Sequence, residues 1–208
     1  MQTKLISLLL FVVCAGNGAT LAQNSPDATL NFDKETTGKI PNDWTAASGT
    51  WVTAADGTNK AIKQVGKSKG ERFNICINNK LKYQNLQLEV RIKPIEGVED
   101  QGGGLVWRYH DPKNYYIARA NPLENNLKIY KVVKGVRKEI KAVNVKMKAG
   151  EWYTLKVAMI GYTLNCYLNE QKLLNATDTT FPNAGQVGFW SRSDAISLFD
   201  DLKIKDLK

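Results

Sequence analysis

Apolar and polar residues alternate along most of the chain after residue 28. Between Leu86 and Ile92 every second residue is Leu, Val or Ile, and the residues between them are polar or charged. A similar period of two recurs from Leu155 to Met159 and on both sides of Gly188. This period places alternate side chains on opposite faces of a β-strand. No window of helical length shows a sustained 3.6-residue repeat with capping residues, so the pattern predicts an all-β protein of about a dozen short strands.

Clusters of turn-forming residues separate these strands. The clearest are Ala55–Gly57, Asp111–Asn114 and Asn121–Asn126, and such spacing favours an antiparallel two-sheet sandwich. The run Gly102–Gly104 is expected to mark a bulge or a close approach between sheets. No linker or internal repeat interrupts the pattern, so residues 23–208 are expected to form a single domain.

The first residues have the pattern of a signal peptide. Lys4 precedes an apolar run from Ile6 to Val13, and Ala22 ends a stretch of small residues that suits cleavage. Residues 1–22 are therefore expected to be removed, which leaves an exported protein, periplasmic or extracellular. The alternative is a lipoprotein anchor at Cys14, but Val13 stands where a small residue is expected. No other segment reaches the ~18 apolar residues of a membrane span.

Composition narrows the possible classes of protein. The chain has 43% apolar and 24% charged residues, which is too hydrophobic for a disordered polymer. Its 29 basic and 20 acidic residues give a net charge of +9, so an acidic glycan, a membrane surface or nucleic acid could be attracted. The single histidine, His110, rules out a centre built from several histidines. No cofactor is required by any motif.

Two cysteines remain after residue 22. Ile75 and Ile77 stand directly beside Cys76, whereas Cys166 is two residues from both Leu164 and Leu168 and shares their face. If both segments are strands, Cys166 faces the core and Cys76 the opposite side. Side chains with opposite directions cannot be bridged without backbone movement, so two free thiols are expected rather than a disulfide.

The most informative segment is the hairpin formed around the turn Asp111–Asn114. If its loop has an even number of residues, one sheet face carries Val106, Arg108, Tyr115, Ile117, Arg119 and Asn121, and the other carries Leu105, Trp107, Tyr109, Tyr116, Ala118 and Ala120. The first face combines arginines, an aromatic ring and an amide. Such groups suit a sugar, because rings stack on its C–H face while Arg and Asn donate to hydroxyls or carboxylates.

Trp190 and Arg192 extend this predicted face. Val187 and Phe189 occupy the core side of the same strand, which leaves Trp190 and Arg192 on the opposite side. The interpretation therefore places Arg108, Tyr115, Arg119, Asn121, Trp190 and Arg192 in one concave groove. The alternative is an ordinary solvated sheet face on which arginine stems cover apolar surface.

Several segments of the sequence resemble a known superfamily. They are Gly103–Tyr109, Asn114–Glu124, Ala184–Trp190 and Phe199–Leu202, and they look like exported bacterial domains of the concanavalin A-like lectin and glucanase superfamily. Within it, they are most similar to the group around the 3-keto-disaccharide hydrolase domain, which is similar to glycoside hydrolase family 16. The resemblance implies a jelly-roll sandwich with a glycan-sized groove on its concave sheet. It says less about activity, because lectins, glycosidases and adhesion modules share this fold.

The sequence lacks the catalytic motif of family 16. Those enzymes carry E-x-D-x-E on one strand, where alternation brings two carboxylates to one groove, and no such triplet occurs here. Glu124 and Asp111 remain as isolated acids in turns beside the groove, and either is a candidate general acid or base, with His110 at the rim nearby. Solvated turn carboxylates are the simpler explanation of such residues.

A calcium site is a further possibility. Asp33 near the start and Asp200 or Asp201 near the end could meet where the terminal strands pair, and relatives keep structural Ca²⁺ at comparable places. Carboxylate oxygens suit this ion. Exposed aspartates that cap strand ends would explain Asp33 and Asp201 equally well.

Two classes of function fit these observations. One is a carbohydrate-active domain that binds a saccharide in the groove, with or without hydrolysis of a small 3-keto-disaccharide. The other is a non-catalytic interaction module of the laminin-G kind that binds a protein or a polyanion. Nucleic acid is disfavoured, because the lysines are not interleaved with aromatic residues in one stripe.

Overall fold

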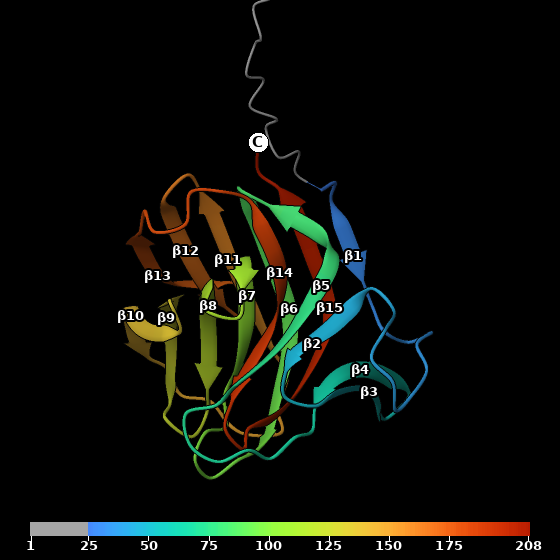
Figure 1. Cartoon of the computed structure of the whole chain (residues 1–208). Helices are drawn as coiled ribbons and strands as arrows, with labels where there is room; N and C mark the ends of the chain where they lie inside the picture. Colours follow the sequence, from blue (N-terminus) through green and yellow to red (C-terminus); the bar gives the residue numbers. More distant parts are fainter. Residues whose placement is uncertain (1–24) are drawn as a thin grey trace, which may run out of the picture.

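A computed structural model describes residues 25–208 and contains only strands, turns and irregular segments there. Fifteen strands form two antiparallel sheets that pack face to face (Figure 1). The predicted all-β, antiparallel two-sheet sandwich is therefore confirmed. The predicted signal peptide lies outside the described residues, so its cleavage after Ala22 stays a prediction.

The first sheet has eight strands. In spatial order it contains β13 (Gln171–Thr177), β12 (Thr163–Leu168), β11 (Tyr153–Ile160), β6 (Leu86–Glu96), β15 (Ile196–Asp206), β4 (Asn59–Gln64) and β3 (Trp51–Asp56), and β1 (Ala28–Leu30) pairs with β15. Its inner face carries the alternating apolar residues that the sequence indicated: Leu86, Leu88, Val90 and Ile92 of β6 are all fully buried.

The second sheet has seven strands. In spatial order it contains β10 (Val136–Asn144), β9 (Asn126–Val133), β8 (Asn114–Asn121), β7 (Gly103–Asp111), β14 (Gly185–Arg192), β5 (Phe73–Tyr83) and β2 (Trp44–Ser48). Gly103 lies where this sheet approaches the first one. A Cβ atom there would come within 2.4 Å of Ile92 Cδ1, so the close approach expected from the glycine run is confirmed.

Strands β7 and β8 form the predicted hairpin, and most of its faces are as expected. Val106, Tyr115 and Ile117 lie on the outer face, whereas Leu105 and Trp107 join the core between the sheets. Tyr109 was expected on the core face but belongs to the outer cluster. The pairing of the two strands is irregular between Trp107 and Asp111, because Arg108 adopts a positive φ of 45° that breaks the alternation.

Cys76 and Cys166 are both free and fully buried. The prediction of two unpaired thiols is confirmed, but its reason was wrong, since both side chains belong to the core between the sheets. Ile75 and Ile77 are buried on the outer face of β5, so the size of the neighbours did not reveal which face was the core. The thiols stay apart because β12 and β5 lie toward opposite ends of their sheets.

Both thiols should resist modification in the folded protein. Burial raises the pKa of Cys166 to about 12 and that of Cys76 further, and the reactive species is the thiolate. In a protein spanning residues 23–208, we expect an aromatic disulfide reagent at pH 8 to titrate neither thiol until denaturant is added, and then both. Failure to find two thiols in the denatured, unreduced protein would show that they are bridged.

Candidate functional site

The outer face of the seven-stranded sheet carries a second apolar cluster. Strands β5, β14, β7, β8 and β9 contribute Ile75, Ile77, Trp190, Val106, Tyr109, Tyr115, Ile117, Tyr130 and Val132. Tyr115 and Trp190 are fully buried there. This sheet is therefore covered on both sides.

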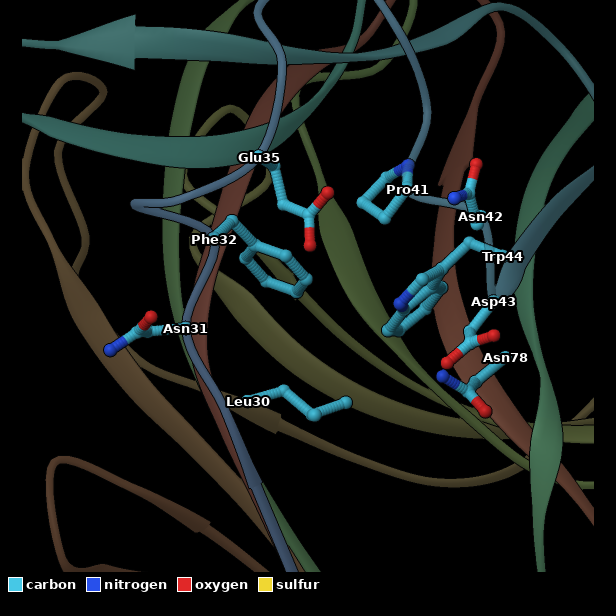
Figure 2. A pocket seen from close by; sticks show the side chains of 9 residues that line it. All are labelled: Leu30, Asn31, Phe32, Glu35, Pro41, Asn42, Asp43, Trp44 and Asn78. Carbon is cyan, nitrogen blue, oxygen red and sulfur yellow. The ribbon is translucent and has the colours of Figure 1, made fainter.

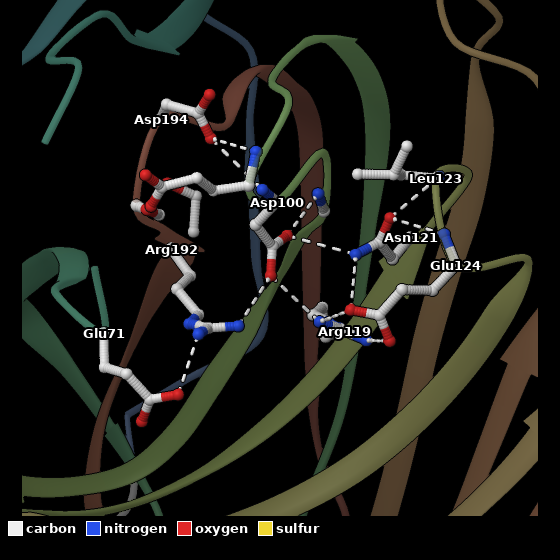
Figure 3. A network of polar contacts seen from close by, with 12 residues as sticks. Glu71, Asp100, Arg119, Asn121, Leu123, Glu124, Arg192 and Asp194 are labelled. Atoms are coloured by element: carbon white, nitrogen blue, oxygen red, sulfur yellow. Dashed lines mark hydrogen bonds and ion pairs between the residues drawn. The ribbon is translucent and has the colours of Figure 1, made fainter. Parts of the chain in front are cut away.

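A network of charged side chains adjoins this cluster (Figure 3). Its centre is Arg119 on β8, whose side chain is only 1% exposed. Arg119 Nη1 donates to Asp100 Oδ2 at 3.0 Å and to Glu124 Oε1 at 3.0 Å. Arg119 Nη2 donates to Glu124 Oε2 at 2.7 Å and to Asn126 Oδ1 at 2.9 Å. Nη1 and Nη2 of Arg119 each donate to one oxygen of the Glu124 carboxylate, and this bidentate arrangement is the strongest geometry for an arginine and a carboxylate.

Asp100 lies in the loop before β7, and hydrogen bonds to Asp194 and from Gly102 fix its position. Asp194 accepts backbone N–H bonds from Val98, Glu99 and Asp100, and Gly102 N donates to Asp100 Oδ1 at 2.7 Å. A Cβ atom at Gly102 would lie 3.0 Å from Arg119 Cδ, so this glycine makes room for the arginine. Burial raises the pKa of Asp100, although Arg119 acts in the opposite direction.

The turn after β8 positions Glu124. Asn121 Oδ1 accepts N–H bonds from Leu123 and Glu124, while Asn121 Nδ2 donates to Asp100 Oδ1 at 3.1 Å. The hydrogen bonds from Arg119 lower the pKa of Glu124 from 4.5 to about 2. Glu124 is therefore an ionised acceptor at neutral pH and a weak proton donor or base.

Arg192 and Arg137 bring two more guanidinium groups to this face. Arg192 lies 3.6 Å from Asp100 and 2.8 Å from Glu71. The guanidinium carbon of Arg137, on β10, lies 4.8 Å from the ring centre of Tyr130, and that of Arg119 lies 5.7 Å from the same ring. Tyr130 thus connects Arg137 to the network of Arg119.

Two hollows open beside these residues. One, of about 480 Å³, is lined by Glu71, Phe73, Gly135, Val136 and Arg137. The other, of about 630 Å³, is lined by Glu124, Asn125, Asn144, Val145 and Lys146. Both are large enough for a sugar ring, and both offer charged or amide groups to its hydroxyls.

A separate cavity of about 300 Å³ lies near β1 and β2 (Figure 2). Leu30, Phe32 and Trp44 provide apolar walls, and Glu35 and Asp43 provide carboxylates. Asp43 is paired with Lys80 at 2.7 Å. None of the residues predicted to bind a ligand lines this cavity.

The structure brings together five of the six predicted binding residues. Tyr115, Arg119, Asn121, Trp190 and Arg192 share the outer face or its rim, and Glu124 lies beside them. Their exposure was not as expected, because Trp190 and Tyr115 are fully buried. The ring centre of Phe73 lies 5.6 Å from that of Trp190, and the guanidinium carbon of Arg137 lies 5.8 Å from the Trp190 ring centre.

The placement of Arg108 in the groove was wrong. Its guanidinium donates to three backbone carbonyls, those of Gln84, Phe181 and Gly161, at 2.8, 2.6 and 2.7 Å. The positive φ of Arg108 turns the side chain out of the sheet face and toward these turns. Arg108 is therefore a structural clamp at the end of the sandwich.

The placement of His110 at the rim was also wrong. His110 is exposed and its ring lies 5.7 Å from that of Phe181, next to the turn that begins β8, whereas Glu124 follows the end of β8. Seven steps of about 3.3 Å separate these ends, or about 23 Å. His110 and Glu124 are therefore too far apart to act on one substrate bond.

The aspartates considered for calcium are already engaged. Asp201 Oδ2 lies 3.2 Å from Arg91 Nη1, and Asp33 Oδ1 accepts the N–H of Lys60 at 3.1 Å. Within residues 25–208, no group of three or more His, Cys, Asp or Glu side chains is placed to hold a metal ion. Calcium binding therefore stays a prediction.

Sequence reasoning missed Asp100, Tyr130 and Arg137. Tyr130 and Lys128 alternate with core residues on β9, so the period-two pattern could have placed them on the outer face. Asp100 lies in a loop whose course no pattern indicates. Separately, no helix among the described residues has the length and apolar character needed to cross a membrane.

Comparisons with known proteins agree on the fold. A family model described as the 3-keto-alpha-glucoside-1,2-lyase-like domain matches residues 27–205. Levanase from Bacillus subtilis (strain 168) is 27% identical over 162 residues, which cover 76% of this chain but only 22% of that protein. The chain thus spans about a fifth of the length of this relative.

Solved structures extend the comparison. The carbohydrate binding module CBM66 from Bacillus subtilis superposes with a TM-score of 0.68 at 22% identity, covering 79% of this chain and 96% of that one. A Bacillus licheniformis beta-glucanase superposes with a TM-score of 0.61 at 13% identity, covering 89% and 100% of the two chains. The predicted resemblance to concanavalin A-like lectins and glucanases is confirmed.

Substitution of Trp190 by Ala should destabilise the protein. The side chain is fully buried, so we expect the free energy of unfolding to fall by about 3–5 kcal/mol. Urea unfolding measures this, with Trp152→Ala as the control, because Trp152 is only partly buried on the outer face of the other sheet. If Trp152→Ala lowered the free energy of unfolding as much as Trp190→Ala or more, the burial of Trp190 in the outer cluster would be contradicted.

The ion pair between Glu124 and Arg119 should stabilise the protein in a pH-dependent way. The folded pKa of Glu124 is about 2, below its ordinary 4.5, so its contribution is present above pH 4.5 and lost as the pH falls toward 2. Because Glu124 is 37% exposed, we expect Glu124→Gln to cost about 1–2 kcal/mol at pH 7.

The same unfolding measurement at about pH 2 should show a much smaller difference between Glu124→Gln and the unmodified protein, since Glu124 is then protonated in the unfolded chain and about half protonated in the folded one. The exposed Glu96, paired with Lys67, provides a control substitution to Gln with a smaller effect. If Glu124→Gln lowered the free energy of unfolding equally at pH 7 and pH 2, the stabilising ion pair between Glu124 and Arg119 would be contradicted.

Proposed function

Because the chain belongs to the family of 3-keto-alpha-glucoside-1,2-lyase-like domains, we propose that it is a carbohydrate-active domain that binds a saccharide on the outer face of its seven-stranded sheet. The observation that carries this proposal is the network of Arg119, Arg192, Asp100, Asn121 and Glu124 at the edge of an aromatic cluster. Fixed donors and acceptors match the hydroxyl edge of a sugar, and the ring of Phe73, which is partly exposed at the edge of this cluster, can contact its C–H face.

The accessible groups define where the sugar binds. Arg192, Glu124 and Lys128 have side chains that are 19%, 37% and 24% exposed. The more deeply buried Arg119 and Asp100 contact Glu124 and Arg192 directly, and Lys128 pairs with Glu124 and Glu139. Groups held this way lose little conformational entropy when a ligand binds, which favours affinity.

Binding is better supported than hydrolysis or elimination. A two-carboxylate hydrolase needs one protonated and one ionised acid near the same bond, and abstraction of a proton next to a keto group needs a free base. Glu124 has a pKa of about 2 and is held by Arg119. Asp100 is fully buried against the same arginine, so neither acid suits these roles.

The names of the similar proteins support a carbohydrate ligand. Levanase and the carbohydrate binding module CBM66 share sequence or fold with this chain. We propose that this domain, like a binding module, recognises a saccharide and leaves bond cleavage to other proteins. Export of the protein, inferred from residues 1–22, would place it where polysaccharides occur.

Arg192→Gln should separate binding from folding. We expect it to weaken binding of a glycan identified on a glycan array by about 1.5–3 kcal/mol, the scale of a hydrogen bond to a charged group. Arg91→Gln is the matched control, because Arg91 also pairs with an aspartate but on the outer face of the other sheet. Isothermal titration calorimetry with both variants measures the difference.

Two results would contradict the proposal. One is equal loss of affinity in Arg91→Gln and Arg192→Gln, which would move the site away from the seven-stranded sheet. The other is the absence of binding to every glycan tested, combined with tight binding to a protein or to unrelated polyanions. That second result would favour the interaction-module hypothesis.

A further inference from the structure

Arg137 differs from the other basic side chains on the outer face of the seven-stranded sheet. Arg119, Lys128 and Arg192 each contact at least one carboxylate. Arg137 forms no ion pair with any residue in 25–208, and its Nη1 atom is buried there without a hydrogen-bond partner. A guanidinium without an acceptor is costly, so this side chain has unused capacity to bind an anion.

Aromatic rings hold the Arg137 guanidinium in place. Its central carbon lies 4.8 Å from the ring centre of Tyr130, 5.4 Å from that of Phe73 and 5.8 Å from that of Trp190. Rings contact the faces of the guanidinium plane, whereas hydrogen bonds form at its edge. The hollow of about 480 Å³ lined by Phe73, Gly135 and Arg137 opens beside it.

The segment that contains Arg137 is rich in basic residues. Residues 128–148 contain eight basic residues and one acidic residue, Glu139. Within the described part of the chain, Lys134, Lys138, Lys141 and Lys146 form no ion pair.

We propose that the saccharide bound on this face carries a carboxylate, as a uronic acid does, and that Arg137 receives this carboxylate in the hollow. The inference rests on the proposed function and specifies its ligand class. A carboxylate matches the edge of a guanidinium with two parallel hydrogen bonds. The sugar ring that carries it would then lie against Phe73, which is partly exposed and lines the hollow.

Glu71 also lines this hollow, and its charge affects how tightly the hollow binds an anion. Its carboxylate is bound by Arg192 at 2.8 Å and its side chain is 78% exposed. A negative charge there opposes an incoming carboxylate. Removal of the charge on Glu71 should therefore strengthen binding of an acidic sugar, whereas removal of the charge on Arg137 should weaken it.

The test compares an acidic glycan with its own neutral form. Oligogalacturonate, oligomannuronate and oligoglucuronate are each titrated into residues 23–208 by calorimetry, beside the same oligosaccharides with methyl-esterified carboxyl groups. We expect at least one acid form to bind about tenfold or more tightly than its ester. The preference should shrink between about 0.05 and 0.5 M salt, because screening weakens charge attraction.

Three variants locate the effect. Arg137→Gln should abolish the preference for the acid form, and Glu71→Gln should increase it. Lys203→Gln is the control, because Lys203 is an exposed lysine on the first sheet that pairs with Glu89. If Arg137→Gln does not fold, Arg137→Lys keeps the charge but loses the paired hydrogen bonds, and most of the preference should still disappear.

Each other outcome overturns the inference in a recognisable way. Equal binding of acids and esters leaves the proposed function intact and shows that the ligand is neutral. Binding of neutral glycans alone would also show that the ligand is neutral. If no glycan bound at all, the proposed function would be wrong as well. If heparin, polyglutamate and duplex DNA bind as tightly as the uronates and Arg137→Gln changes none of them, the surface binds polyanions without recognising a sugar.

Discussion

The outer face of the seven-stranded sheet depends on the neutralisation of one buried cation. Arg119 is 1% exposed, and an uncompensated guanidinium at such a position would be strongly destabilising. Asp100 and Glu124 supply the compensation, and they come from loops on either side of the β7–β8 hairpin. The course of both loops, the glycine at position 102 and the Asn121 turn all serve this one requirement. The accessible groups of the candidate site are fixed as a consequence.

The two sheets differ in what covers their outer faces. The first sheet presents alternating charges to solvent, with pairs such as Lys203 with Glu89 and Arg91 with Asp201. The second sheet is packed on both faces, by the core on one side and by the outer aromatic cluster on the other. Arginine side chains, and not a further layer of strands, cover this cluster on its outer side. This difference is the reason why the proposed saccharide site lies on the second sheet.

The sequence predicted the parts of the fold that depend on regular alternation. Residues 86–92 and the hairpin up to Trp107 lie on the faces that period two assigned to them. Prediction failed at Arg108, because a single residue with positive φ reverses the alternation after it and carries no sequence signature. It also failed for Cys76, because a strand buried on both sides has large apolar residues on both faces.

The candidate site was only partly predictable for a related reason. Alternation identifies which side chains share a face, and this was sufficient for Arg119, Asn121 and Trp190. It says nothing of the loop that brings Asp100 to Arg119, nor of how far Arg137 reaches across Tyr130. Those contacts depend on the order of strands in the sheet, which one sequence does not reveal.

The Arg108 clamp has a consequence for the kinetics of folding. Its three carbonyl partners are 24, 53 and 73 residues away along the chain, so the clamp closes only after distant turns have docked. We expect contacts between such distant segments to be completed after the transition state for folding. In that case the clamp slows unfolding more than it speeds folding, and it lengthens the lifetime of the folded sandwich.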